Sequence, residues 1–259
     1  MIHLILLGAA GKMGRAVSAA LPRFPEMTLE AALEHPAHPE LGALVIPDKG
    51  QQQAVRLSSQ WPNELPAGSV LIDFSNPESC IEAIGMARRL RTPVVSGTTG
   101  LSPEQQARLV LAAEEIPIVQ SPNMAIGVNI LFSLLESLSR NLPANFDIEV
   151  IEAHHRHKAD APSGTALRIL QILESRGTPR VGRWGRTGER DSHEIGIHAL
   201  RLGGHVGEHT VRACSASEEI SLTHRALDRG LFAEGALLAA SFIVRQSSGL
   251  FGMKDVLGL

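Results

Sequence analysis

The first half of the chain alternates short apolar segments with stretches of helical periodicity. This alternation predicts a parallel, doubly wound sheet with helices on both faces. Strands are expected at residues 2–7, 27–33, 70–74, 93–96 and 116–119. Helices are expected at residues 12–21, 78–90 and 103–113, and Ser102 precedes Pro103 as the cap of the third.

The pattern changes after Val128. Helices are expected at residues 129–139 and 164–174, and strands at 146–153, 194–202, 208–213 and 220–224. Successive strands with few helices between them indicate an antiparallel or mixed sheet. The helix expected at 231–244 is apolar enough to pack back on the first domain. The predicted fold is therefore α/β: a Rossmann-like dinucleotide-binding domain (1–126, with 230–259 returning to it) and a smaller α+β substrate-binding domain with a mixed sheet (127–229).

Composition excludes several classes of protein. A net charge of −3 and an aromatic share of 3%, without any tyrosine, argue against a nucleic-acid partner. Two cysteines cannot form a disulfide framework and favour a reducing compartment. The apolar run at the amino end stops at Gly8, too short for a signal peptide, and no segment approaches the ~20 apolar residues of a membrane span. We therefore expect a soluble, cytoplasmic protein without a membrane partner.

A glycine-rich turn follows the first expected strand. Its spacing, Gly-x-x-Gly-x-x-Gly over Gly8, Gly11 and Gly14, allows a tight turn and close approach of the backbone to a pyrophosphate. The phosphates would lie at the amino end of the next helix, where free N–H groups favour anions. Because such turns are common, the spacing alone does not identify a dinucleotide site.

The context of this turn strengthens the dinucleotide interpretation. Glu34 ends the second strand, where an acidic residue commonly binds the adenosine ribose. The segments 97–100 and 121–124 each follow a strand of the same sheet. Ligands bind outside the carboxyl ends of such strands, so a nicotinamide ribose would lie there.

An unusual basic run follows the strand expected at 146–153: His154, His155, Arg156, His157 and Lys158. It could be a solvated loop, although three histidines in five residues are rare. It could also bind a metal through His154 and His157, with Glu152 as a further ligand. The third interpretation is an anion site with acid–base chemistry, since histidine titrates near working pH.

The neighbouring segment Ser163-Gly164-Thr165 favours the third interpretation. Ser163 is a natural cap for the following helix, and the N–H groups of Gly164 and Thr165 would face a carboxylate. Cations on one side and a helix amino terminus on the other form a receptor for a small, multiply charged acid.

These residues closely resemble the signature of the dihydrodipicolinate reductase family. The signature comprises residues 152–158 and 160–167, and further matches lie at 8–15, 73–75, 97–100, 125–129, 207–210 and 248–251. The resemblance covers almost the whole chain. It implies an NAD(P)H-dependent oxidoreductase that reduces 4-hydroxy-tetrahydrodipicolinate in lysine and diaminopimelate biosynthesis, acts as a homotetramer and holds no metal.

The resemblance also implies roles for individual residues. His154 and Lys158 would be catalytic, handling protons after hydride transfer. His155, Ser163, Gly164 and Thr165 would bind the dicarboxylate substrate. The implied contacts of NADH or NADPH are Gly8, Ala9, Ala10, Gly11, Lys12, Met13, Glu34, His35, Gly97, Thr98, Thr99, Ser121, Pro122, Asn123 and Met124.

One position departs from relatives that use NADPH well. They often carry arginine after the acidic residue, where this chain has His35. We therefore predict that NADH is used at least as well as NADPH, although Lys12 or Arg15 could substitute for the missing cation. Two alternatives remain open: another two-domain reductase acting on an aldehyde or semialdehyde, and a non-catalytic dinucleotide sensor that retained the fold.

Overall fold

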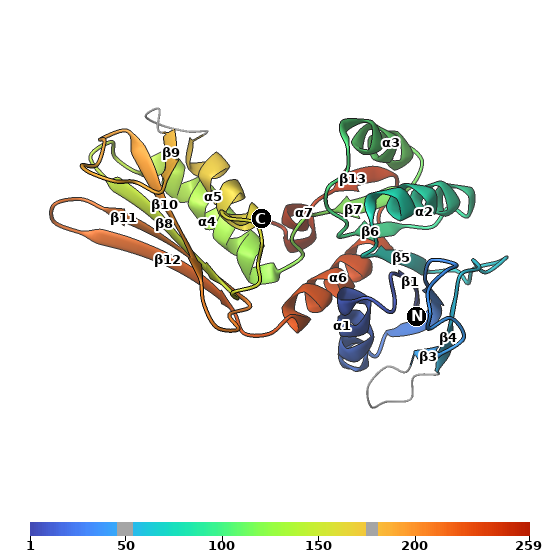
Figure 1. Ribbon diagram of the computed structural model, residues 1–259. Coiled ribbons are helices and arrows are strands. Elements are labelled where there is room, and N and C mark those ends of the chain that lie inside the picture. Colours follow the sequence, from blue (N-terminus) through green and yellow to red (C-terminus); the bar gives the residue numbers. More distant parts are fainter. Residues whose placement is uncertain (46–53, 175–180) are drawn as a thin grey trace. The chain divides into compact units, whose positions relative to one another are not determined.

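The computed structural model describes residues 1–45, 54–174 and 181–259. The chain forms two compact units: Met1–Ile126 together with Arg229–Leu259, and Gly127–Asp228 (Figure 1). Within the described residues, no helix combines the length and the apolar character needed to cross a membrane.

The first unit is built on an eight-stranded sheet with the order β13-β7-β6-β5-β1-β2-β4-β3. Its strands are β1 (Ile2–Leu7), β2 (Met27–Leu33), β3 (Leu44–Val45), β4 (Val55–Ser58), β5 (Ser69–Asp73), β6 (Val94–Ser96), β7 (Pro117–Gln120) and β13 (Gly249–Phe251). All neighbours pair in parallel except β3 and β4. The order reverses between β1 and β5, the position where open α/β sheets bind ligands.

Helices cover both faces of this sheet because β1 is apolar on both sides. Leu4 and Leu6 belong to a core with α1 (Lys12–Ala20) and α6 (Gly230–Ile243). Ile5 and Leu7 face the opposite way and pack with α2 (Pro77–Arg89) and α3 (Pro103–Ala113). The unit also contains the 3-10 turn η1 (Leu21–Arg23) and α7 (Met253–Leu257). This arrangement confirms the predicted doubly wound sheet.

The second unit contains a five-stranded mixed sheet with the order β12-β11-β8-β10-β9. Its elements are α4 (Ile126–Asn141), β8 (Asp147–His154), α5 (Gly164–Glu174), β9 (Val181–Trp184), β10 (Glu194–Arg201), β11 (Gly207–Cys214) and β12 (Glu219–Ala226). Strand β8 pairs in parallel with β10 and antiparallel with β11. Apolar residues of α4 and α5 pack on the sheet face that carries Ile148 and Val150, which confirms the expected mixed sheet.

The structure corrects one boundary that matters for the site. The sequence pattern ends the strand before His154, whereas β8 includes this residue. The physical reason is that β8 has partners on both sides, and His154 lies opposite Arg201 of β10. As the last residue on the inner face of a central strand, His154 is buried and not part of the solvated loop.

Candidate functional site

The glycine turn of the first unit is closely packed. Gly8 has a φ of +76°, and a Cβ there would lie 2.7 Å from the carbonyl oxygen of Phe74. A Cβ on Gly14 would overlap the backbone of Gly8 and Ala9. Helix α1 begins directly after Gly11, which caps it without a side-chain hydrogen bond. The N–H groups of Gly8, Ala9, Ala10 and Gly11 already donate within the protein. The pyrophosphate of a dinucleotide would therefore be bound at the first turn of α1.

The structure brings Glu34 against this turn. Its Oε1 accepts a hydrogen bond from the Ala10 N–H at 3.0 Å, and its Oε2 accepts from the His35 N–H at 3.3 Å. Of the two cations that could replace an arginine at position 35, Arg15 is already paired with Glu40 at 2.6 Å. The carboxylate and the turn therefore lie together, as a ribose and pyrophosphate site requires.

The loops after β6 and β7 are fixed by buried polar contacts. The Asp73 carboxylate accepts hydrogen bonds at 2.8 Å from the hydroxyls of Ser96 and Thr98, which hold the turn after β6 in place. Gly97 is required there because a Cβ would enter the ring of Phe74. The sequence did not single out Asp73 as the anchor, although it stands at the end of a buried strand.

The segment after β7 forms a compact turn of its own. The Ser121 hydroxyl donates to the Asn123 carbonyl at 2.8 Å, and the Asn123 side chain accepts from the Ala125 N–H at 2.9 Å. Met124 is buried, whereas Pro122 is exposed. The turns after β1, β5, β6 and β7 thus all lie at carboxyl ends of neighbouring parallel strands.

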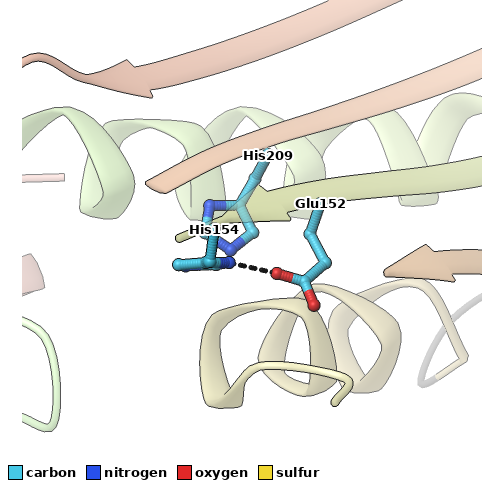
Figure 2. Close-up of side chains that lie close together, drawn as sticks. All are labelled: Glu152, His154 and His209. Carbon is cyan, nitrogen blue, oxygen red and sulfur yellow. Dashed lines mark hydrogen bonds and ion pairs between the residues drawn. The ribbon is translucent and has the colours of Figure 1, made fainter. Parts of the chain in front are cut away.

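A cluster of buried polar side chains lies on the helix-covered face of the second sheet. Figure 2 shows Glu152 and His154 of β8 with His209 of β11. The Glu152 carboxylate pairs with Nδ1 of His154. The rings of His154 and His209 meet edge to face, with centroids 5.1 Å apart. All three residues are at most 8% exposed.

Further contacts join this cluster to α5 and β10. The Ser163 hydroxyl lies 3.0 Å from Nε2 of His209 and accepts from the Ala166 N–H at 3.2 Å, which confirms Ser163 as the cap of α5. Arg201 donates to Oε1 of Glu152 at 2.8 Å and to the carbonyl of Asp160 at 2.5 Å. The amino end of α5 and the loop after β8 are therefore held by the same cluster.

The remaining predicted residues of the basic run have different surroundings. Lys158 forms an ion pair with Asp160 at 2.9 Å, and its side chain is 24% exposed. His155 is half-buried, and its Nδ1 has no hydrogen-bond partner among the residues described. Arg156 and His157 are exposed. The structure thus places Lys158 and His154 in ordered positions and leaves Arg156 and His157 in solvent.

Burial sets the protonation of the cluster. Burial, opposed in part by Glu152, lowers the pKa of His154 below its ordinary value. Burial together with the charge of His154 lowers the pKa of His209 to about 4. Burial would raise the pKa of Glu152, but Arg201 and His154 outweigh it and the pKa is lowered. At neutral pH the cluster holds a carboxylate with two neutral imidazoles.

A metal ion is the alternative use of such a cluster. Ligand atoms of Glu152, His154 and His209 lie within 4.8 Å of one another, so the geometry differs from the predicted pair of His154 with His157. Each of these groups already has a hydrogen-bond partner, and the Arg201 cation lies against the carboxylate. A metal would have to displace those partners and repel the guanidinium, so the arrangement favours acid–base chemistry.

Comparisons with known proteins identify the family. Residues 2–124 match the family model described as "Dihydrodipicolinate reductase, N-terminus", and residues 127–257 match "Dihydrodipicolinate reductase, C-terminus". The 4-hydroxy-tetrahydrodipicolinate reductase of Nitrosomonas europaea is 42% identical over 264 residues, covering 100% of this chain and 98% of that protein. The enzyme of the same name from Rubrobacter xylanophilus is 44% identical over 262 residues, covering 99% and 98%.

Solved structures share the fold of this chain. The dipicolinate-bound dihydrodipicolinate reductase from Paenisporosarcina sp. TG-14 matches with a TM-score of 0.75 at 25% identity, covering 99% of this chain and 100% of that one. A myo-inositol dehydrogenase from Corynebacterium glutamicum shares the fold with a TM-score of 0.61 at 13% identity, covering 99% and 92%. With two family models spanning nearly all residues and full-length relatives above 40% identity, the chain belongs to the dihydrodipicolinate reductase family.

Proposed function

We propose that this protein catalyses the NAD(P)H-dependent reduction of 4-hydroxy-tetrahydrodipicolinate to tetrahydrodipicolinate in lysine and diaminopimelate biosynthesis. The observation that carries the proposal is the ordered cluster of Glu152, His154 and Ser163 beside Lys158, in a chain whose full-length relatives bear that enzyme's name. The solved relative of similar fold has dipicolinate bound, a ligand of the same chemical class.

The first unit, residues 1–126 with 230–259, would bind the cofactor. The turn 8–13 would receive the pyrophosphate, Glu34 and His35 the adenosine ribose, and segments 97–99 and 121–124 the nicotinamide side. The crowding around Gly8 and Gly14 supports this assignment, because it requires the tight turn and the close packing that glycines provide in dinucleotide-binding loops. A bound nicotinamide supplies a hydride, and the protein contributes position and electrostatics.

The second unit, residues 127–229, would bind the substrate. The N–H groups of Gly164 and Thr165 begin α5, where the helix dipole favours a carboxylate. Ser163 fixes that end of the helix through its hydrogen bonds. His155, half-buried in the loop after β8, would provide a further polar contact to the substrate.

Protonation of the reduced substrate would be the task of Lys158 and His154. The 4-hydroxyl group first leaves as water, which gives a C=C bond conjugated with the imine. Addition of a hydride to that C=C bond leaves negative charge on the substrate, and a nearby ammonium group can donate the proton that neutralises it. Lys158 is held in an ordered position by Asp160. His154 is neutral at working pH and lies on the same segment, where it can bind or relay a proton.

Two further properties complete the proposal. NADH should serve at least as well as NADPH, because position 35 is histidine and Arg15 is engaged by Glu40. The protein should be a cytoplasmic homotetramer built through the second sheet, whose face opposite α4 and α5 carries paired polar groups such as Arg212 with Glu219. Light scattering should then give about four times the 27.7 kDa chain mass.

The test is an assay of NADH and NADPH oxidation with freshly generated 4-hydroxy-tetrahydrodipicolinate. We expect turnover with both cofactors and kcat/KM for NADH equal to or above that for NADPH. Absence of turnover with both cofactors would refute the activity. A strong preference for NADPH would refute the assignment at His35 alone.

A further inference from the structure

Glu152 receives hydrogen bonds from three different elements. Nδ1 of His154 lies against one carboxylate oxygen, and the other accepts from Arg201 at 2.8 Å and from the Ser163 N–H at 3.3 Å. The carboxylate itself is 0% exposed. None of these donors is supplied by solvent, so the carboxylate is a fixed junction between β8, β10 and the start of α5.

The ionisation of the Glu152 carboxylate determines which tautomer the His154 imidazole adopts. Despite burial, the Arg201 cation and His154 keep the pKa of Glu152 below its ordinary value. An ionised carboxylate can only accept hydrogen bonds, so Nδ1 of His154 must carry the proton of the pair. The other nitrogen, Nε2, has no hydrogen bond among the residues that the structure describes.

The space around Nε2 of His154 depends on a glycine. A Cβ on Gly207 would lie 3.1 Å from this nitrogen, closer than ordinary contact. Glycine at the start of β11 therefore leaves room for the ring in the orientation that Glu152 imposes. The imidazole of His154 is thus bound by Glu152 at Nδ1, and Gly207 leaves space beside Nε2.

We propose that Glu152 is a positioning residue for His154, holding it as the Nδ1–H tautomer so that Nε2 is the nitrogen that exchanges protons during the reaction. The inference rests on the proposed function for its catalytic consequence. Through Ser163, the same carboxylate also orients the amino end of α5. One buried group therefore aligns the proton-handling histidine with the helix terminus that would bind the substrate carboxylate.

The test combines nitrogen NMR with kinetics. Two-bond ¹H–¹⁵N spectra of the histidine rings distinguish the two tautomers, with the His154 signal assigned by its loss in His154→Gln. In the wild type we expect the Nδ1–H form. In Glu152→Gln the amide oxygen would keep Arg201, and its NH₂ group would then face Nδ1 and favour the Nε2–H form. We expect kcat to fall about 100-fold and the NADH dissociation constant to change less than twofold.

The chain offers a matched control on the same strand. Glu149 pairs with His198 at 2.7 Å and with Arg186 at 3.0 Å, so it has the same kinds of partners on the opposite face of β8. Glu149→Gln should leave both kcat and the His154 spectrum unchanged. A general effect of removing a carboxylate from this sheet would appear in both variants.

The outcomes are separable. An Nε2–H tautomer of His154 in the wild type would overturn the inference even if Glu152→Gln did not fold. A folded Glu152→Gln with unchanged tautomer, or with kcat within twofold of wild type, would overturn it as well. A wild-type protein without reductase activity would refute the proposed function instead, and the tautomer would still be measured in the presence of dipicolinate.

Discussion

The ammonium group of Lys158 is held in place before any substrate arrives. It pairs with Asp160 at 2.9 Å, and the hydrogen bond from Lys158 is the main reason that the pKa of Asp160 is lowered. The carbonyl of Asp160 is in turn bound by Arg201. A residue on a loop after a strand thereby acquires a defined position, which proton transfer requires.

Lys158→Ala should lower kcat by about 100-fold, the usual contribution of a positioned general acid. The dissociation constant of NADH should stay within twofold, because the proposed cofactor contacts lie in the other unit. Steady-state kinetics and a fluorescence titration with NADH would measure the two quantities. Lys254→Ala, which removes an exposed lysine from α7, is the control. Turnover of Lys158→Ala within twofold of wild type would contradict the assigned role.

At the scale of elements, Ser163 has two tasks at the start of α5. Its hydroxyl accepts from the Ala166 N–H and lies at hydrogen-bond distance from His209. In the other unit, Ser102 caps α3 in a capping box with Gln105, and Pro103 occupies the first helical position. The two serines are therefore chemically matched caps, one inside the site and one outside it.

Ser163→Ala should lower the free energy of unfolding by about 2 kcal/mol, from loss of the cap and of the partner of His209. Ser102→Ala should cost about 1 kcal/mol. Dipicolinate affinity, measured by calorimetry, should fall about tenfold in Ser163→Ala and remain unchanged in Ser102→Ala. Wild-type affinity in Ser163→Ala would show that the helix end does not bind the carboxylate.

The sequence predicts elements where the periodicity is long and the end signals are strong. Helix α3 begins at Pro103 and ends at Ala113 as expected, because Ser102-Pro103 marks its start. Strands β3, β4, β9 and β13 were not expected, since two to four residues carry no measurable period and the structure places these strands by pairing with others.

The site was predictable only in part, for a related reason. The glycine spacing and the cap at Ser163 are local signals, so both could be predicted from the sequence. The contacts of Arg201 with Glu152 and of His209 with Ser163 join residues 49 and 46 positions apart. They follow from the strand order of the mixed sheet, which periodicity does not reveal. The sequence marked His209 only as part of the matched segment 207–210.

For the molecule as a whole, the buried histidines set how stability depends on pH. The pKa of His209 is about 4 when folded and about 6.5 when unfolded. As pH falls below 6.5, the unfolded chain therefore binds a proton before the folded one, and stability is lost down to pH 4. The groups that face His209 are Glu152, His154, His224 and Lys158.

The lowered pKa of His209 corresponds to about 3 kcal/mol for this residue alone. His209→Gln should therefore reduce the loss of unfolding free energy between pH 7 and pH 4 by about that amount. Urea denaturation followed by circular dichroism at several pH values would measure it. His193→Gln removes an exposed histidine of the same unit and should leave the slope unchanged. Equal slopes in His209→Gln and wild type would contradict the assignment.

The discontinuous first unit has a consequence for biosynthesis. Its core joins Leu4 and Leu6 of β1 to Ala236 and Leu237 of α6, and β13 pairs with β7 at the edge of its sheet. The ribosome completes Ile126 roughly 100 residues before it reaches α6, an interval of about 5–20 s at usual rates of translation. During that time part of the sheet's apolar face lacks its final cover. By the end of the interval, residues 127–228 contain every strand of their own unit. The unit of residues 127–228 can thus be finished first on the nascent chain, and the unit that starts the sequence is finished last.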